Sequence, residues 1–397
     1  MRPPLISLPC ATGFTSTFSI GAFPALLPEL GAGRLADWQL GLVAAAFGLT
    51  RMLADVPVGL FLTHHLRSAL ALGPLVVLVG LLALTLGGGS LPVLVLGRAV
   101  MGAGHALGMV GGLTAILRHQ TRVLGSALNA YELSAILGML GGTIVLAVLP
   151  SRLPWNVALL VTCMPQLLGV LLIPAVLAAL PREEPGAARP LFARQLGDCV
   201  PSRTLSRGVV LAFVTGGTVA VAYASVEQFV IPLRASREFG LPRAGVAQLL
   251  MTVQLCDIVC LLPVGLLADR WGGGRILSTS LFVFGAGVGL VAFGDLTLLT
   301  LGCALFGMGM SGWTLPLGLL RRDTAPGQLA WRTALYRVGV DGVIFLGPLL
   351  SGLLASHWPG LLPGLLVLIL GGVAMLLLPG EWKRGRPDGG GGFRRAA

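Results

Sequence analysis

Apolar runs of about 20 residues follow one another along nearly the whole of this 397-residue chain. A helix needs about 20 mostly apolar residues to cross a lipid bilayer. With 55% hydrophobic and 11% charged residues, the chain has too few charges for the solvated surface of a water-soluble globule. The pattern therefore predicts an all-α polytopic membrane protein.

One long hydrophilic stretch, residues 181–205, interrupts the apolar runs. We expect six spans before it, in residues 1–180, and six after it, in residues 206–380. The stretch is predicted to link the halves, and the glycine-rich residues 381–397 to form a disordered tail. The predicted spans cover residues 5–28, 39–62, 69–88, 91–117, 124–149, 155–180, 206–233, 243–268, 275–294, 296–320, 331–355 and 359–379.

The net charge of +11 comes almost entirely from arginines spread over short loops, so we expect no nucleic-acid partner. Most loop arginines fall on the side of the amino terminus. By the positive-inside rule, we expect a multi-pass protein of the inner (plasma) membrane with both termini, the linker and the tail in the cytoplasm. The loop arginines predicted on the opposite side are Arg34, Arg152, Arg234, Arg237 and Arg243.

Short sequence elements recur between the two halves at offsets of 205 or 206 residues. They indicate six-helix halves related as parallel repeats about an axis along the membrane normal. The recurring elements include Pro57 to Leu60 with Pro263 to Leu266, Gly97, Gly102 and Gly104 with Gly302, Gly307 and Gly309, and Tyr131 with Tyr336.

The loop from Pro263 to Arg275 sets Asp269, Arg270 and Arg275 around three glycines at the end of an apolar run. A carboxylate just beyond a membrane span, with arginines beside it, can act as a charged latch between helix ends. Glycines such as Gly265 let helix backbones approach closely. We predict that this loop latch, defined by Asp269, Arg270 and Arg275, has a gating role.

The loop resembles a signature of the major facilitator superfamily, Gly-x-Leu-Ala-Asp-Arg-x-Gly followed by basic residues. The first-half counterpart begins at Gly59 and has Thr63 where Asp269 stands, so we expect the second-half latch to carry the gating role alone. The matching residues are Gly265, Leu267, Ala268, Asp269, Arg270 and Gly272.

Two further segments carry this resemblance. Arg98, followed by spaced glycines, is similar to the superfamily's fourth-helix signature, in which the arginine is thought to tune a proton-carrying acid. Gly347 and Pro348 belong to an element close to one linked to proton-driven exporters, although packing alone would also explain it. The resemblance, to the drug:proton antiporter-like branch, implies twelve transmembrane helices in two pseudo-symmetric halves that move a small molecule by alternating access.

Several charged residues fall inside predicted spans, where an unpaired charge costs about 3 kcal/mol or more. Arg51 and Asp55 are four residues apart, as are Arg337 and Asp341. Each pair can form a local ion pair, or can face a central cavity and bind substrate or protons. Asp257 occupies the repeat position of Arg51, so these two residues can also pair across the halves.

Arg98 is either satisfied by backbone carbonyls or functional. Glu132 and Glu227 have no evident partner within their own helices, so either can take up and release a proton as water access alternates. We therefore place proton coupling at Glu132, Glu227 or Asp257. Internal Arg98 and Arg337 favour an anionic substrate, whereas the carboxylates favour a cationic one.

No nucleotide-binding loop, Ser/His/Asp set or His-Glu-x-x-His motif indicates ATP-driven pumping or an enzyme. A membrane-embedded transferase is the enzyme-class alternative. Cys256 and Cys260 share a helix face without a convergent histidine, so we expect neither a metal site nor a cofactor. The leading hypothesis is a monomeric secondary transporter for proton-coupled export of amphipathic compounds. The alternatives are proton-coupled or facilitated uptake of a small organic solute, and a non-transporting membrane sensor or assembly protein.

Overall fold

The computed structural model describes residues 4–32, 35–87, 89–119, 124–180, 206–324 and 326–378, and these residues form helices without strands. The first half contains α1 (Pro4–Gly31), α2 (Asp37–Leu86), α3 (Leu91–His119), α4 (Leu124–Val148), α5 (Trp155–Thr162), α6 (Pro165–Leu171) and α7 (Ile173–Ala179). The second half contains α9 (Arg207–Ala222), η1 (Tyr223–Val230), α10 (Ile231–Arg237), α11 (Arg243–Trp271), α12 (Gly273–Phe293), α13 (Leu296–Met310), α14 (Leu315–Arg322), α15 (Pro326–Ala355) and α16 (Leu361–Leu377).

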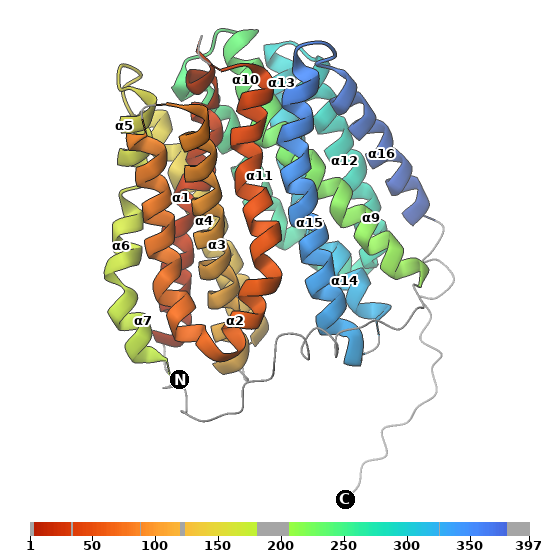
Figure 1. Ribbon diagram of the computed structural model, residues 1–397. Coiled ribbons are helices and arrows are strands. Elements are labelled where there is room, and N and C mark those ends of the chain that lie inside the picture. The colour runs from red at the N-terminus through yellow and green to blue at the C-terminus, as the bar shows by residue number, and fades with distance from the viewer. Residues whose placement is uncertain are drawn as a thin grey trace, which may run out of the picture.

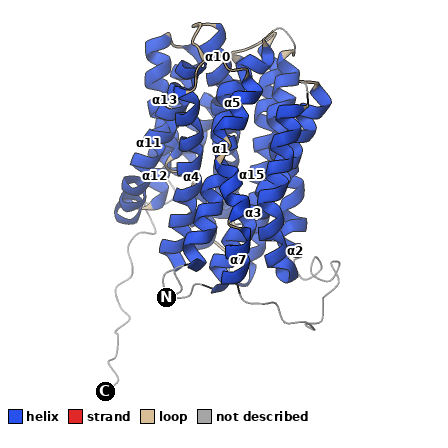
Figure 2. Cartoon of the chain, turned by 90° about the vertical axis from the view of Figure 1, so that its left-hand side faces the viewer, coloured by secondary structure: helices blue, strands red, loops and turns tan. Residues whose placement is uncertain are grey.

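The two halves stand side by side, red to yellow and green to blue (Figure 1). The start of α1 and the end of α7 lie at one end of the bundle, and α5 and α10 lie at the other (Figure 2). We call these the amino-terminal end and the opposite end. The expected linker, residues 181–205, and the expected tail, residues 381–397, lie outside the described residues.

The twelve predicted spans correspond to this longer run of helices. In the described chain, nine segments are long and apolar enough to cross a membrane, and Leu361–Leu377 is a shorter apolar helix. The predicted span 155–180 is the row α5 to α7, broken by short turns. The remaining predicted span, 39–62, is the first part of α2. The structure therefore confirms the all-α polytopic fold.

Helix α2 is long enough to supply two spans. Its 50 residues would measure about 75 Å at 1.5 Å per residue, more than twice the thickness of the hydrocarbon core of a bilayer. The backbone leaves the helical region at His65, with φ −133° and ψ 38°. This kink separates a first leg, Asp37 to His64, from a second leg, His65 to Leu86.

Equivalent glycines make equivalent contacts in the two halves. A Cβ on Gly102 would overlap the carbonyl oxygen of Phe47, and one on Gly307 would overlap that of Val253, which is the repeat position of Phe47. Small residues at these crossings let the helix backbones touch. The sequence repeat is therefore also a repeat of packing, as expected for two related six-helix bundles.

Helix α15 packs tightly on the first leg of α2 through one of its glycines and leaves another free. A Cβ on Gly352 would lie 2.5 Å from the carbonyl oxygen of Asp37 and 2.9 Å from Gly41 Cα, whereas one on Gly339 would meet no atom within 4 Å. Gly352→Ala should therefore cost about 2 kcal/mol through overpacking. We expect a lower apparent Tm in detergent for Gly352→Ala and an unchanged or slightly higher Tm for Gly339→Ala. Equal shifts in both variants would contradict this packing of α2 against α15.

Candidate functional site

Arg51 on α2 pairs with Asp341 on α15, and this ion pair joins the two halves inside the membrane. Arg51 Nη2 lies 2.9 Å from Asp341 Oδ1 and 3.3 Å from Oδ2. The expected local pairs, Arg51 with Asp55 and Arg337 with Asp341, are therefore wrong, as is a pair between Arg51 and Asp257. The reason is the close, glycine-mediated contact of α2 with α15. It brings Arg51 to Asp341 on the facing helix, and Arg51 pairs with this residue and not with Asp55 one turn along α2.

The four residues predicted as two separate pairs nevertheless lie together. Asp55 lies next to Asp341, and the charges of Arg51 and Arg337 act on it. Asp55 Oδ2 has no hydrogen-bond partner in the described part of the chain. The Asp341 side chain is 2% exposed and that of Arg51 is 21% exposed, so the pair is more deeply buried on the Asp341 side.

Glu132 on α4 and Asp257 on α11 bring two more carboxylates to the same region. The charges of Arg337 and Arg51 act on Glu132, and the charge of Glu132 acts on Asp257. Both side chains are partly exposed, and neither forms an ion pair with a described residue. Two helices from each half, α2 and α4 with α11 and α15, therefore enclose six charged side chains. We call these six residues, Arg51, Asp55, Glu132, Asp257, Arg337 and Asp341, the central charge cluster.

Glu227 lies beside this cluster in η1, a π-helical segment that interrupts the α-helical run of α9 and α10. It is 3% exposed. Gln254 Nε2 on α11 donates to Glu227 Oε1 at 3.5 Å, and Thr143 Oγ1 on α4 donates to Gln254 Oε1 at 2.8 Å. Sequence reasoning missed Gln254 and Thr143, although a lone amide in an apolar run was an available signal. Insertions of π-helix are frequent at functional sites.

Arg98 on α3 is buried against aromatic rings. Its side chain lies 3.9 Å from the ring centroid of Phe23 and 4.8 Å from that of Phe47, and the residue is 2% exposed. The expectation that backbone carbonyls satisfy it is wrong for Nε and Nη1, which have no hydrogen-bond partner in the described chain. Cation–π attraction to the rings partly replaces the missing hydrogen bonds. Phe47 also lies 5.9 Å from Arg51, so it stands between Arg98 and the central charge cluster.

Two ion pairs close the opposite end of the bundle, and sequence reasoning found neither. Arg243 on α11 binds Glu29 on α1 through two hydrogen bonds, Nε to Oε1 at 2.7 Å and Nη2 to Oε2 at 2.6 Å. Arg243 Nη2 also donates to the carbonyl oxygen of Leu153 at 2.5 Å. Arg237 on α10 binds Asp37 on α2 at 2.7 Å. In both pairs the acid comes from the first half and the arginine from the second.

The predicted loop latch lies at the exposed end of α11 and the start of α12. Asp269, Arg270 and Arg275 are exposed, and Asp269 forms no ion pair with a described residue. A Cβ on Gly265 would meet no atom within 4 Å. Gly272 ends α11 with φ +93°, a conformation that explains the glycine of the signature at this position.

The other predicted gating positions are placed differently. Gly59 lies within the first leg of α2, and the side chain of Thr63 is outside the described part of the chain. Gly347 packs on η1: a Cβ added to it would lie 3.0 Å from the backbone nitrogen of Ser225. On α2, a Cβ added to Gly41 would lie 2.5 Å from the carbonyl oxygen of Pro348. The exporter-like element thus forms a close contact between α15, η1 and α2.

The family model described as Major Facilitator Superfamily matches residues 6–231 and 208–394 of this chain. The chain belongs to this superfamily. Membership makes it a multi-pass membrane protein with the fold of this superfamily. The superfamily resemblance read from the loop latch is therefore confirmed.

A protein named uncharacterized MFS-type transporter YE1530, from Yersinia enterocolitica serotype O:8 / biotype 1B, is 26% identical over 270 residues. The match covers 64% of this chain and 62% of that relative's length. The nucleoside transporter NupG has a similar structure, with a TM-score of 0.71, 12% identity, and coverage of 94% of this chain and 98% of that one. A POT family transporter in complex with 5-aminolevulinic acid gives a TM-score of 0.76 at 12% identity, covering 94% and 95%. At such low identity these structures establish the fold alone.

The ion pair between Arg51 and Asp341 can be measured with a double-mutant cycle. Removing one partner of a buried pair is expected to cost about 3 kcal/mol, because the other is left uncompensated. Arg51→Ala and Asp341→Ala should each lower the apparent Tm in detergent, and the double variant should lose less than the two losses added together. The matched cycle of Arg51 with Asp55 should show less than half of that coupling. A larger coupling energy for Arg51 with Asp55 than for Arg51 with Asp341 would contradict this pairing and support the local ion pair.

The ion pairs at the opposite end differ in burial, and hydrogen–deuterium exchange should reveal this. The Arg243 side chain is 1% exposed and that of Arg237 is 45% exposed. Exposed pairs contribute about 0–1 kcal/mol, whereas breaking a buried one costs several times more. Arg243→Ala should therefore speed exchange at the end of α1 and the start of α11, and Arg237→Ala should have little effect. Similar exchange in both variants would contradict a closure held mainly by Glu29 and Arg243.

Proposed function

We propose that this transporter works by alternating access and couples proton movement to the export of amphipathic compounds. The observation that carries the proposal is the central charge cluster, to which two helices of each half contribute. Charged side chains inside a bilayer are costly and are found where proteins move ions, protons or polar solutes. The cluster lies between helices of the two halves, and the proposal takes this interface as the one along which the halves rock.

The two ends of the bundle support an alternating cycle. Glu29–Arg243 and Asp37–Arg237 hold the opposite end closed. At the amino-terminal end, Asp269 of the loop latch is exposed and forms no ion pair with a described residue. In the proposed cycle, rocking of the halves breaks the two pairs at the opposite end and brings Asp269 of the latch to a partner at the amino-terminal end.

Glu132, Asp257 and Glu227 are the proposed proton carriers. Glu132 and Asp257 lack an ion-pair partner in the described part of the chain, and Glu227 is held only by the neutral amide of Gln254. Protonation removes the charge that opposes closure of apolar helices around these groups. A proton can therefore be taken up when water reaches the carboxylate from one side and released when water reaches it from the other.

The choice of substrate depends on which unpaired charges face the solute. Glu132 and Asp257 favour a cationic amphiphile, and this is the leading proposal. Arg337 also forms no ion pair with a described residue, and it favours proton-coupled or facilitated uptake of a small organic anion as the second candidate. A sensor or assembly protein that does not transport remains the non-transport alternative.

We further propose that the chain acts as a monomer in the inner (plasma) membrane, with its amino-terminal end in the cytoplasm. The excess of loop arginines at this end supports the orientation. The opposite end, with its two closing ion pairs, then faces outward.

Neutral replacement of the carriers tests proton coupling. With the protein in proteoliposomes and ethidium as the probe, we expect transport driven by a proton gradient in the parent protein. Glu132→Gln, Glu227→Gln or Asp257→Asn should reduce the gradient dependence at least about tenfold in one or more variants, because a neutral amide cannot exchange the proton. Asp295→Asn, which replaces an exposed helix-capping acid outside the central charge cluster, is the control. Undiminished gradient dependence in all three variants would contradict the coupling scheme, and ethidium exchange without any gradient dependence would favour facilitated transport.

A further inference from the structure

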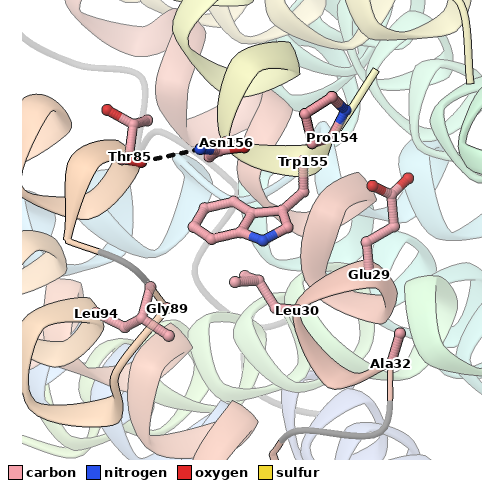
Figure 3. A pocket seen from close by; sticks show the side chains of 9 residues that line it. All are labelled: Glu29, Leu30, Ala32, Thr85, Gly89, Leu94, Pro154, Trp155 and Asn156. Carbon is pink, nitrogen blue, oxygen red and sulfur yellow. Dashed lines mark hydrogen bonds between the residues drawn. The ribbon is translucent and has the colours of Figure 1, made fainter. Parts of the chain in front are cut away.

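A separate cavity of about 460 Å³ lies near the opposite end, within the first half, between α1, α2, α3 and α5 (Figure 3). Its volume falls within the roughly 300–1,000 Å³ of small-molecule sites. It shares none of its described lining residues with the central charge cluster. Its walls are apolar at Leu30 and Leu94 and carry polar groups at Glu29, Thr85, Trp155 and Asn156.

Glu29 gives this cavity a carboxylate that is fixed in place and still accessible. Arg243 holds each oxygen with one hydrogen bond, and the Glu29 side chain remains 33% exposed. A carboxylate has about four lone-pair sites, so Glu29 can accept further hydrogen bonds or lie against a second cation. The residue is therefore shared between the closing ion pair and the cavity.

Trp155 supplies an aromatic face beside that carboxylate. Its indole ring occupies the middle of the cavity wall, with Glu29 and Leu30 on one side and Leu94 on the other (Figure 3). Cations bind over the face of an indole more strongly than over other rings. A carboxylate next to an aromatic plane is suited to an organic cation with an apolar body.

The remaining polar groups include a further acceptor for a cation. Asn156 Nδ2 donates one of its two N–H groups to the carbonyl oxygen of Thr85 at 3.2 Å, and the Asn156 amide oxygen is an available acceptor. No lysine or arginine lines the cavity in the described ranges of the chain. The described lining thus offers a carboxylate, an amide oxygen and a π-face to a cation, and the N–H groups of Trp155 and Asn156 to polar atoms of the same ligand.

We propose that this cavity binds an organic ammonium group, with the apolar part of the ligand on Trp155 and the cationic nitrogen against Glu29. Because Glu29 also holds Arg243, a bound cation competes with Arg243 for the same carboxylate and weakens the closure of the opposite end. The ammonium can belong to a soluble amphipathic cation or to the headgroup of phosphatidylethanolamine. The site is independent of the proposed proton carriers.

Binding of benzyltrimethylammonium to the purified full-length protein in detergent, measured by isothermal titration calorimetry, tests the site. We expect saturable binding that Glu29→Gln weakens about tenfold and Trp155→Leu about fivefold, since the first variant removes the charge and the second the π-face. Asp37→Asn is the matched control: it removes one carboxylate from the other closing ion pair but does not touch the cavity, so affinity should stay within about twofold.

Equal affinity in the parent protein, Glu29→Gln and Trp155→Leu would overturn the proposal. So would an equal loss in Glu29→Gln and Asp37→Asn, because the binding would then report closure of the bundle and not the cavity. Nanodiscs separate the two ligand sources. Weaker probe binding with phosphatidylethanolamine than with phosphatidylglycerol alone supports the lipid headgroup, and unchanged binding supports a soluble cation. The equilibrium assay requires no transport, so a failure of the proposed transport function leaves its result interpretable.

Discussion

Burial of charge in a low-dielectric interior is the constraint on which the organisation of this protein depends. An isolated charge in a bilayer is expensive, so each one is held by a partner, a ring or access to water. The contact between α2 and α15 provides one such partner, because glycines at 41 and 352 let the helices approach until Arg51 meets Asp341. The fold and the functional interface are therefore set by the same close packing.

The charges at the two ends and in the centre have different surroundings. At the opposite end, Arg243 is buried and binds Glu29 through two hydrogen bonds, so this pair can hold the halves together. In the centre, Glu132 and Asp257 are left without ion-pair partners among the described residues, and this is why they are proposed to respond to protons or to a solute. A transporter needs both kinds of charge, because it must form stable closures and also respond to what it carries.

Much of this organisation could be predicted from the sequence, because it depends on local pattern. The lengths of the apolar runs predicted the membrane spans. The recurrence of Gly102 at Gly307 predicted that the two glycines occupy equivalent helix contacts, and they do. The members of the central charge cluster were also found, because any charge within an apolar run is conspicuous. Their partners were not found: Arg51 and Asp341 are 290 residues apart, and no local spacing encodes a contact between halves. For the same reason, the pair of Glu29 with Arg243 could not be predicted. The contacts of Arg98 with aromatic rings could not be predicted either, because the rings belong to α1 and α2 and the arginine belongs to α3.

The central claim is that the halves rock and that Glu29–Arg243 holds one end closed. Double electron–electron resonance can measure this directly with spin labels at exposed positions of both halves, Ala36 with Glu238 at the opposite end and Ser68 with Trp271 at the amino-terminal end. Introducing Arg243→Ala should lengthen the distance at the opposite end and shorten the distance at the amino-terminal end. Distances that stay the same at both ends, or that lengthen together, would contradict the account.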